Sequence, residues 1–191
     1  MTIDVTTFDI RGPLLLTPKK FEDTRGFFSE IYSARTLAEI GIDLLFVQDN
    51  QSLSVERGTV RGLHFQAPPF AQDKLVRVTR GSVLDVAVDI RKGSPTYGKH
   101  VAVELSAKNW CQLLVPKGFA HCFCTLEPNT EMIYKVTNYY SAECDRGIFW
   151  NDPALEIAWP SFAGANISAK DASLPVLADV GNPFTYTDID K

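Results

Sequence analysis

The sequence has few of the residues that bind metals or form cross-links. Its 191 residues include three histidines and four cysteines. Cys111, Cys122, Cys124 and Cys144 stand in apolar or strand-like surroundings, and the Cys-x-Cys pair lacks the second pair that a structural zinc site needs. We therefore expect reduced cysteines that pack as small hydrophobic side chains, as in a cytoplasmic protein.

Long apolar runs and a surplus of positive charge are also missing. No apolar stretch approaches the roughly 20 residues that span a bilayer, and the first residues, MTIDVTTFDIRGP, lack the basic and apolar parts of a secretory signal. The net charge of −4 argues against a nucleic-acid surface. We expect a cytoplasmic protein with no membrane or nucleic-acid partner. An anionic ligand would need a local group of cations, for which Arg25, Arg61 and Lys74 are candidates.

The length and the hydrophobic content of 45% suit a single domain over residues 1–191. Between residues 72 and 140, short alternating segments are separated by turn residues. The predicted strands are Lys74 to Thr79, Val83 to Ile90, Val101 to Leu105, Cys111 to Val115, Ala120 to Leu126 and Glu131 to Asn138. Strands at a spacing of about 8–12 residues are typical of an antiparallel sandwich or barrel, so the chain is predicted to be mainly β.

Few helices are expected. One is predicted from Ala34 to Ile40, with Ser33 as its N-cap and Gly41 at its C-terminal end. The residues after Trp159 are richer in Pro, Ser, Ala and Gly, and we expect short helices or extended loops there.

A predicted strand carries the first candidate site, the segment RGLHFQ from Arg61 to Gln66. Because side chains alternate along a strand, Arg61 and Leu63 should face one way and His64 and Gln66 the other, unless a bulge at Gly62 redirects one of them. A histidine near the positive charges of Arg61 and Lys74 is suited to remove a proton beside the carbonyl of an anionic substrate. A purely structural histidine is an equal alternative for this segment alone.

Four further segments each allow a functional and a structural interpretation. They are Phe21 to Glu30, Gln48-Asp49-Asn50, Val115 to Phe123 with His121, and Met132 to Val136 with Tyr134, followed by Tyr139-Tyr140. In the functional interpretation Arg25 binds phosphate, Glu30 accepts from a base or sugar, and Tyr134 donates a proton. In the structural one, the first segment is a solvated hairpin, the second a polar strand end, and the tyrosine packs in the core.

A metal site is not expected. Metal-binding barrels of this class place closely spaced histidines, as His-x-His, on one strand. Here Gln66 stands at the second of these positions, and the histidines are at 64, 100 and 121.

Taken together, these segments resemble the dTDP-4-dehydrorhamnose 3,5-epimerase family, whose members invert carbons 3 and 5 of a nucleotide-linked 4-keto-6-deoxyglucose on the route to rhamnose. The matching segments, in the family's order, are FEDTRGFFSE (21–30), QDN (48–50), RGTVRGLHFQ (57–66), KLVRVTRGSVLDVAVDIRKGSPTYGK (74–99), PKGFAHCF (116–123), YKVTNYYSAECDRGIFWNDP (134–153) and SAKD (168–171). They cover most of the chain. The resemblance implies an antiparallel jelly-roll sandwich of the cupin type, a homodimer, a dTDP-sugar substrate, and no metal or organic cofactor.

The resemblance also implies roles for the residues whose type matches. His64 would be the base, paired with Asp171 in a dyad. Lys74 would stabilise the enolate oxygen, and Tyr134 would be the acid on the opposite face. The substrate contacts would be Arg25, Gln48, Asn50 and Arg61 for the diphosphate and sugar, with Asp49 in the same motif, Glu30 and Tyr140 for the thymidine, and His121, Asp145 and Lys170 beside them.

One position departs from the family pattern. Cys122 follows the Ala-His pair where a glycine is expected, and its larger side chain is predicted to crowd the pocket beside His121.

Two alternatives remain open on the sequence. One is a single-site epimerase that acts at carbon 3 or carbon 5 only. The other is a non-catalytic cupin that binds a nucleotide or a sugar. The presence of a base, an acid and a lysine together argues against the second, because binding alone does not require an acid–base pair.

Overall fold

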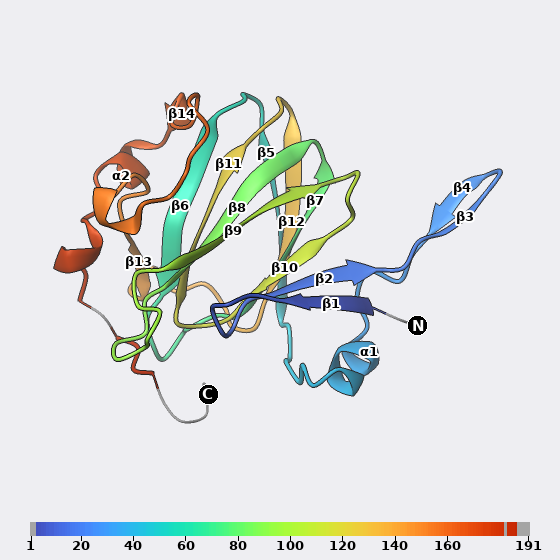
Figure 1. Ribbon diagram of the computed structural model, residues 1–191, viewed down its shortest axis with the longest axis horizontal. Coiled ribbons are helices and arrows are strands. Elements are labelled where there is room, and N and C mark those ends of the chain that lie inside the picture. The colour runs from blue at the N-terminus through green and yellow to red at the C-terminus, as the bar shows by residue number, and fades with distance from the viewer. Residues whose placement is uncertain (1–2, 182, 187–191) are drawn as a thin grey trace.

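Two facing β-sheets make up most of this computed structural model, which describes residues 3–181 and 183–186 (Figure 1). The strands are β1 (Ile3–Thr7), β2 (Leu14–Pro18), β3 (Phe21–Asp23), β4 (Gly26–Phe28), β5 (Gln48–Ser54), β6 (Thr59–Gln66), β7 (Lys74–Arg80), β8 (Ser82–Asp89), β9 (His100–Ser106), β10 (Gln112–Val115), β11 (Phe119–Thr125), β12 (Thr130–Val136), β13 (Asp145–Gly147) and β14 (Asn166–Ile167). The helices are α1 (Ala34–Glu39), α2 (Ala169–Ala172) and the 3-10 turns η1 (Pro153–Leu155) and η2 (Leu177–Asp179).

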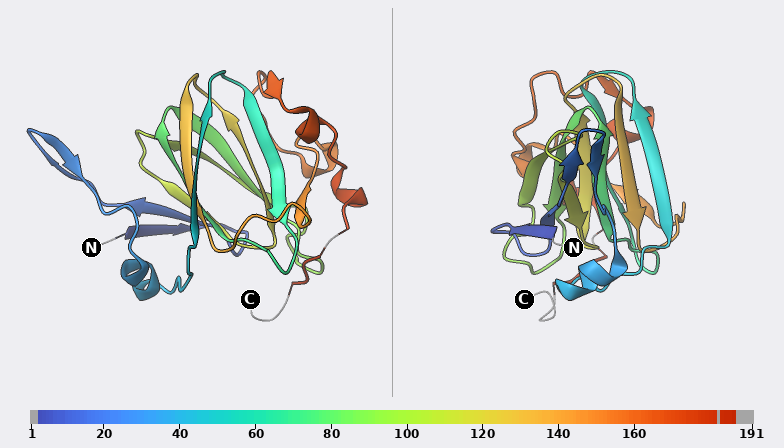
Figure 2. Two further views of the ribbon diagram at one scale, coloured as in Figure 1. Left: turned by 180° about the vertical axis from the view of Figure 1, so that it is seen from behind. Right: turned by 90° about the vertical axis from the view of Figure 1, so that its right-hand side faces the viewer.

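The two sheets form a sandwich. The first sheet has the order β1-β2-β10-β7-β12-β5, and the second has the order β13-β6-β11-β8-β9, with β14 beside β6. Figure 2 shows the two layers from behind and from the side. Pairing between the named strands is antiparallel except for the short β14–β6 pair. From β5 onward the chain crosses repeatedly from one sheet to the other, so residues distant in sequence face each other across the interior. The predicted antiparallel β-sandwich is confirmed.

The predicted elements agree closely with the observed ones. Each of the six strands predicted between residues 72 and 140 is present, with ends within two residues of the prediction. Helix α1 begins after Ser33, whose side chain accepts a hydrogen bond from the Thr36 amide at 3.3 Å. Residues 48–50 do lie at a strand end, which is the start of β5 at Gln48, and the apolar run 44–47 before it is not a strand.

Hydrophobic side chains pack in three layers. The main core lies between the sheets and includes Val76, Leu113 and Phe123. A second cluster lies on the outer face of the second sheet, where the segment after β13 covers it with Ile148 and neighbouring aromatic residues. A third lies beneath α1, which packs Leu37 against the first sheet. The interior between the sheets therefore holds both the main core and, beside it, a cavity.

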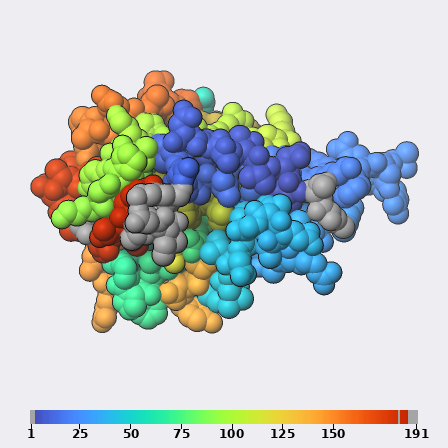
Figure 3. All heavy atoms as spheres, turned by 60° about the horizontal axis from the view of Figure 1, so that its bottom comes forward, coloured from blue at the N-terminus to red at the C-terminus, as the bar shows by residue number. Residues whose placement is uncertain are grey.

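The β3–β4 hairpin, which we call the arm, extends away from the sandwich (Figure 3). Its strands are exposed along their whole length, and Phe27 and Phe28 are 53% and 62% exposed. Such apolar exposure on a projecting hairpin is typical of a contact surface.

Among the described residues, no helix is long and apolar enough to cross a membrane. The prediction of one domain over residues 1–191 extends beyond the described residues and stays a prediction.

Candidate active site

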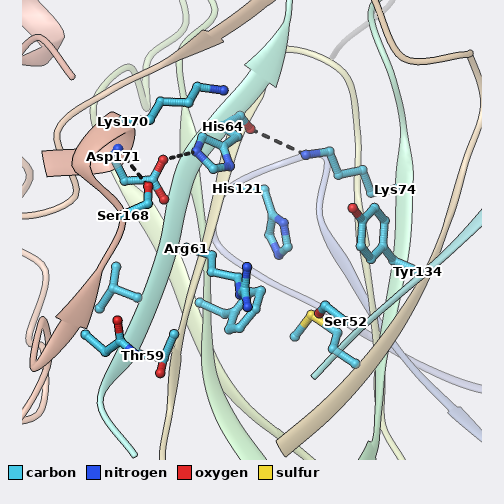
Figure 4. Close-up of a pocket in the computed structure, with 14 residues that line it drawn as sticks. Ser52, Thr59, Arg61, His64, Lys74, His121, Tyr134, Ser168, Lys170 and Asp171 are labelled. Carbon is cyan, nitrogen blue, oxygen red and sulfur yellow. Dashed lines mark hydrogen bonds and ion pairs between the residues drawn. The ribbon is translucent and has the colours of Figure 1, made fainter. Parts of the chain in front are cut away.

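A cavity of about 480 Å³ with many polar side chains on its walls lies between the two sheets (Figure 4). It is lined by Ser52, Thr59, Val60, Arg61, His64, Lys74, His121, Phe123, Met132, Tyr134, Asn166, Ser168, Lys170 and Asp171. A smaller cavity of about 210 Å³ shares His64, Lys74, Tyr134 and Lys170 with it and extends toward Gln48, Asn50, Tyr140 and Asp145. Segments between Gln48 and Asp171 that are distant in sequence therefore meet at one place.

A bulge in β6 brings Arg61 and His64 to the same cavity. His121 pairs with His64, whereas Phe123 pairs with Arg61, so β6 has one residue more than β11 between these pairs. Gly62 occupies the bulge with φ +125°, and a Cβ there would lie 2.5 Å from the His121 carbonyl oxygen. The plain alternation predicted for this strand is wrong, and the bulge alternative holds: Leu63 joins the outer cluster while Arg61 and His64 face inward.

His64 forms a pair with Asp171 of α2. Its Nε2 lies 2.7 Å from the Asp171 carboxylate, and the side chains are 31% and 6% exposed. Ser168 caps α2 by accepting a hydrogen bond from the Asp171 amide, which fixes the start of this short helix. Burial raises the pKa of Asp171, but hydrogen bonds from His64 and the Gly62 amide outweigh it, and the pKa lies below its ordinary value. A charged carboxylate thus orients an imidazole that is open to the cavity.

A second histidine–aspartate pair lies beside the first. His121 Nε2 is 2.9 Å from the Asp85 carboxylate on the adjacent strand β8, and these side chains are only 9% and 0% exposed. Asp85 was not among the sequence predictions. A signal was present, because an aspartate inside the apolar alternation of a predicted strand needs a buried partner.

Lys74 extends from β7 into the space between the sheets. Its Nζ lies 3.5 Å from the His64 carbonyl oxygen (Figure 4). Burial lowers the pKa of Lys74 to about 8, and the carboxylates of Asp145 and Asp85 oppose this shift. The ammonium group is therefore present at neutral pH in a site that solvates it poorly.

Tyr134 lies across the cavity from His64 (Figure 4). The two come from facing sheets, since Tyr134 belongs to β12 and His64 to β6. Burial raises the pKa of Tyr134, with Arg61 opposing, so the phenol keeps its proton at neutral pH. Arg61 donates to Ser54 Oγ at 3.2 Å and to the Leu53 carbonyl at 3.3 Å.

A further polar network surrounds the smaller cavity. Asp145 accepts hydrogen bonds from the Tyr140 hydroxyl at 3.2 Å and from the Lys170 ammonium. The bond to Asp145 raises the pKa of Lys170. Gln48 donates to Asn50 at 2.8 Å on the facing sheet. Tyr140, Asp145, Lys170, Gln48 and Asn50 are thus brought together as predicted from the resemblance.

Three predicted contact residues do not lie in the cavity of their own chain. Asp49 faces the opposite side of β5 and pairs with Lys135 at 2.9 Å. Arg25 stands at the tip of the arm, with its side chain 88% exposed. Glu30 accepts from Thr36 Oγ1 at 3.1 Å beside α1. For Asp49 strand alternation is the cause, whereas Arg25 lies on the arm and Glu30 on the segment that joins the arm to α1.

Cys122 does not crowd the cavity. It is fully buried in the outer cluster, on the opposite face of β11 from His121. Burial raises the pKa of its thiol well above the ordinary value, so the side chain behaves as an apolar group. All four cysteines are free thiols. Within residues 3–181 and 183–186, no three His, Cys, Asp or Glu side chains are grouped as metal ligands.

Comparison with known proteins gives a consistent result. A family model described as dTDP-4-dehydrorhamnose 3,5-epimerase matches residues 7–179. A dTDP-4-dehydrorhamnose 3,5-epimerase of Sinorhizobium fredii is 54% identical over 175 residues, which cover 92% of this chain and 90% of the relative.

Solved structures agree in fold as well as in sequence. The Bacillus anthracis enzyme of the same name, with TDP and pyrophosphate bound, has a TM-score of 0.88 and 49% identity over 92% of this chain and 99% of its own. The Legionella pneumophila dTDP-6-deoxy-D-glucose-3,5-epimerase, in complex with dTDP-4-keto-L-rhamnose, has a TM-score of 0.91 and 41% identity over 97% and 100%. The predicted cupin-type jelly roll is confirmed by these matches.

Proposed function

Because this chain belongs to the dTDP-4-dehydrorhamnose 3,5-epimerase family, we propose that it converts dTDP-4-dehydro-6-deoxy-D-glucose to dTDP-4-dehydro-L-rhamnose in rhamnose biosynthesis. The chain is an isomerase that inverts carbons 3 and 5. The observation that carries the assignment of roles is the placement of a paired histidine and a protonated tyrosine on opposite walls of one cavity.

His64 serves as the base in this proposal. Both carbons lie beside the C4 ketone, so each loses its hydrogen as a proton if the resulting enolate is stabilised. The imidazole removes that proton, and the carboxylate of Asp171 stabilises the imidazolium that forms. The exposure of His64 toward the cavity gives the substrate access to the base.

Lys74 and Tyr134 complete the reaction. The ammonium of Lys74 stabilises the charge that develops on the ketone oxygen, and a low local dielectric strengthens this interaction. Tyr134 delivers a proton to the face of the planar enolate opposite His64, which inverts the carbon. A phenol whose pKa is raised carries no negative charge that would compete with the enolate.

The remaining polar residues bind the substrate. Arg61 is the cavity cation best placed for the diphosphate, with Gln48 and Asn50 as further donors. Tyr140 contacts the thymidine beside Asp145 and Lys170, and His121 with Asp85 fixes the sugar. Binding of these remote groups positions the ring between base and acid.

We also propose a homodimer in which the arm completes a neighbour's site. Arg25 and Glu30 match the family motif but stand outside their own cavity, and the exposed phenylalanines of the arm need a contact surface. A fully active monomer of 21.2 kDa in sedimentation would refute this proposal. A cytoplasmic location and the lack of membrane and nucleic-acid partners stay predictions.

The assigned reaction is tested by incubating the protein with the keto sugar in D₂O and analysing the recovered sugar by NMR. We expect deuterium at carbons 3 and 5 together with inversion of both. Exchange and inversion at one carbon only would establish a single-site epimerase, and no exchange at either carbon would establish a binding protein. Because we propose no metal cofactor, EDTA should leave the rate unchanged; loss of activity restored by one added metal would contradict this.

A further inference from the structure

Gln66 is a buried residue beside the cavity that has no role in the reaction described above. It follows His64 by two positions on β6, and only 5% of its surface is exposed. Its side chain lines the smaller cavity. Since a buried amide is costly unless its N–H groups and its oxygen have partners, the contacts of Gln66 indicate what it does.

Within the described part of the chain, the Gln66 side chain makes three hydrogen bonds, all to backbone groups of two loops. Nε2 donates to the carbonyl oxygens of Phe70 at 2.7 Å and Tyr139 at 3.0 Å. Oε1 accepts from the amide of Ser141 at 2.6 Å. One side chain therefore ties the loop after β6 to the loop between β12 and β13. A glutamine supplies both donors and the acceptor that this arrangement needs.

Tyr140 lies between the two residues, Tyr139 and Ser141, whose backbone groups bond to Gln66 on this loop. Its side chain is 61% exposed, and its hydroxyl reaches Asp145. The backbone of Asp145 pairs in turn with Gln66 in the β13–β6 ladder. Gln66 thus holds the tyrosine from both neighbouring residues and also holds the strand that carries its hydroxyl partner.

We propose that Gln66 is a positioning residue for the nucleotide end of the substrate, which acts by fixing the loop that presents Tyr140. The inference rests on the proposed function, in which Tyr140 contacts the thymidine. Gln66 acts through the loop backbone, which receives the three hydrogen bonds of its side chain. Its loss should therefore weaken nucleotide binding much more than it slows proton transfer.

The loops have other connections that should survive without Gln66. Gln72 donates to the Asn138 carbonyl at 2.7 Å, and Asn138 donates to the Pro69 carbonyl at 3.2 Å. These bonds keep the two loops together. A Gln66 variant should therefore loosen Tyr140 in a folded protein.

The test is Gln66→Glu, which keeps the shape of the side chain but removes both donors. Two carbonyl oxygens would then face a carboxylate, and we expect the Kd for dTDP and the KM to rise about 10–100-fold, with kcat within about threefold. Asn109→Asp is the matched control. Its amide likewise ties a turn, accepting from the Ser106 amide at 3.0 Å and donating to the Glu104 carbonyl at 2.7 Å, but it lines neither cavity. The control should leave Kd, KM and kcat unchanged.

A double-mutant cycle with Tyr140→Ala distinguishes positioning from a general structural role. If Gln66 acts through Tyr140, the double variant binds dTDP about as weakly as Tyr140→Ala alone. Additive losses, an unchanged Kd in Gln66→Glu, or an equal loss in kcat would overturn the proposal. If Gln66→Glu does not fold, Gln66→Met removes the same bonds without adding charge, and loss of folding in both would also overturn it. Failure of the proposed function is separate, because it would appear as wild-type protein that neither binds dTDP nor exchanges deuterium.

Discussion

The two histidine–aspartate pairs share their chemistry but differ in their surroundings. His64 and His121 are register partners on β6 and β11, and each directs Nε2 to a carboxylate. Asp171 reaches His64 from a short helix near the end of the chain, and that imidazole is 31% exposed. Asp85 reaches His121 from the neighbouring strand, and that imidazole is 9% exposed. In the proposed function, the greater exposure of the His64 imidazole, and not the pair itself, is what suits this histidine to act as the base.

The largest effect is expected from His64→Ala. Without the base no enolate forms, so epimerisation and deuterium uptake at carbons 3 and 5 should both fall by at least about 10³-fold. His121→Ala should still exchange deuterium, because it removes only a contact to the sugar. NMR of the sugar recovered from D₂O measures both. Loss of exchange in His121→Ala, together with retained exchange in His64→Ala, would contradict the assignment of His64 as the base.

Tyr134→Phe should separate exchange from inversion. His64 can still remove a proton, exchange it with solvent and return a deuteron to the same face, whereas delivery to the opposite face loses its donor. We expect uptake with retained configuration and a rate of inversion lower by about 10²–10⁴-fold. Ring coupling constants in the NMR spectrum report the configuration. Inversion of both carbons at the wild-type rate would show that another group is the acid.

Much of this arrangement could be predicted from the sequence, and the exceptions have physical causes. The six central strands follow from alternation and turn residues, which are local signals. The meeting of His64 with Asp171 depends on contacts between residues 107 positions apart, so the expectation came only from the resemblance. Asp85 was missed because its partner lies on a different strand. The direction of the Asp49 side chain depends on where β5 begins. The apolar run 44–47 gave no sign that the strand begins only at Gln48.

The two aspartates offer a direct comparison by the same substitution. Asp171→Asn removes the charge that stabilises the imidazolium of His64, and we expect kcat to fall about 10²-fold. Asp85→Asn should lower kcat less than about tenfold in this view. It should instead lower the free energy of unfolding by about 1–3 kcal/mol, because it weakens a fully buried pair. Denaturant titration and steady-state kinetics of both variants are the measurements; equal losses of kcat would contradict the distinction.

The pH dependence of kcat/KM tests the role of Lys74, which lies beside the His64 carbonyl oxygen. In the proposed function Lys74 acts as an ammonium. Its pKa is about 8, so kcat/KM should decline above pH 8 and approach a tenfold loss per pH unit. Tyr134 does not cause this decline, since burial raises its pKa. The carboxylate of Asp85 raises the pKa of Lys74, so Asp85→Asn should move the decline to lower pH. A wild-type profile that is flat from pH 7 to 10 would exclude the proposed role of the ammonium.

The smallest effect is expected at Cys122, which lies next to His121 in sequence but on the other face of β11. Its side chain packs in the outer cluster against the residues that cover the second sheet, while His121 is held from the inner face by Asp85. Cys122→Ala should therefore leave kcat/KM within about threefold and lower the free energy of unfolding by about 1 kcal/mol. Cys124→Ala is the matched control, because Cys124 is equally buried in the same cluster one alternation further along the strand. Similar small effects in both variants would mean that the core holds the His121 pair without help from Cys122. A loss of kcat/KM above about tenfold in Cys122→Ala alone would mean that packing on the outer face sets the position of His121 within the cavity.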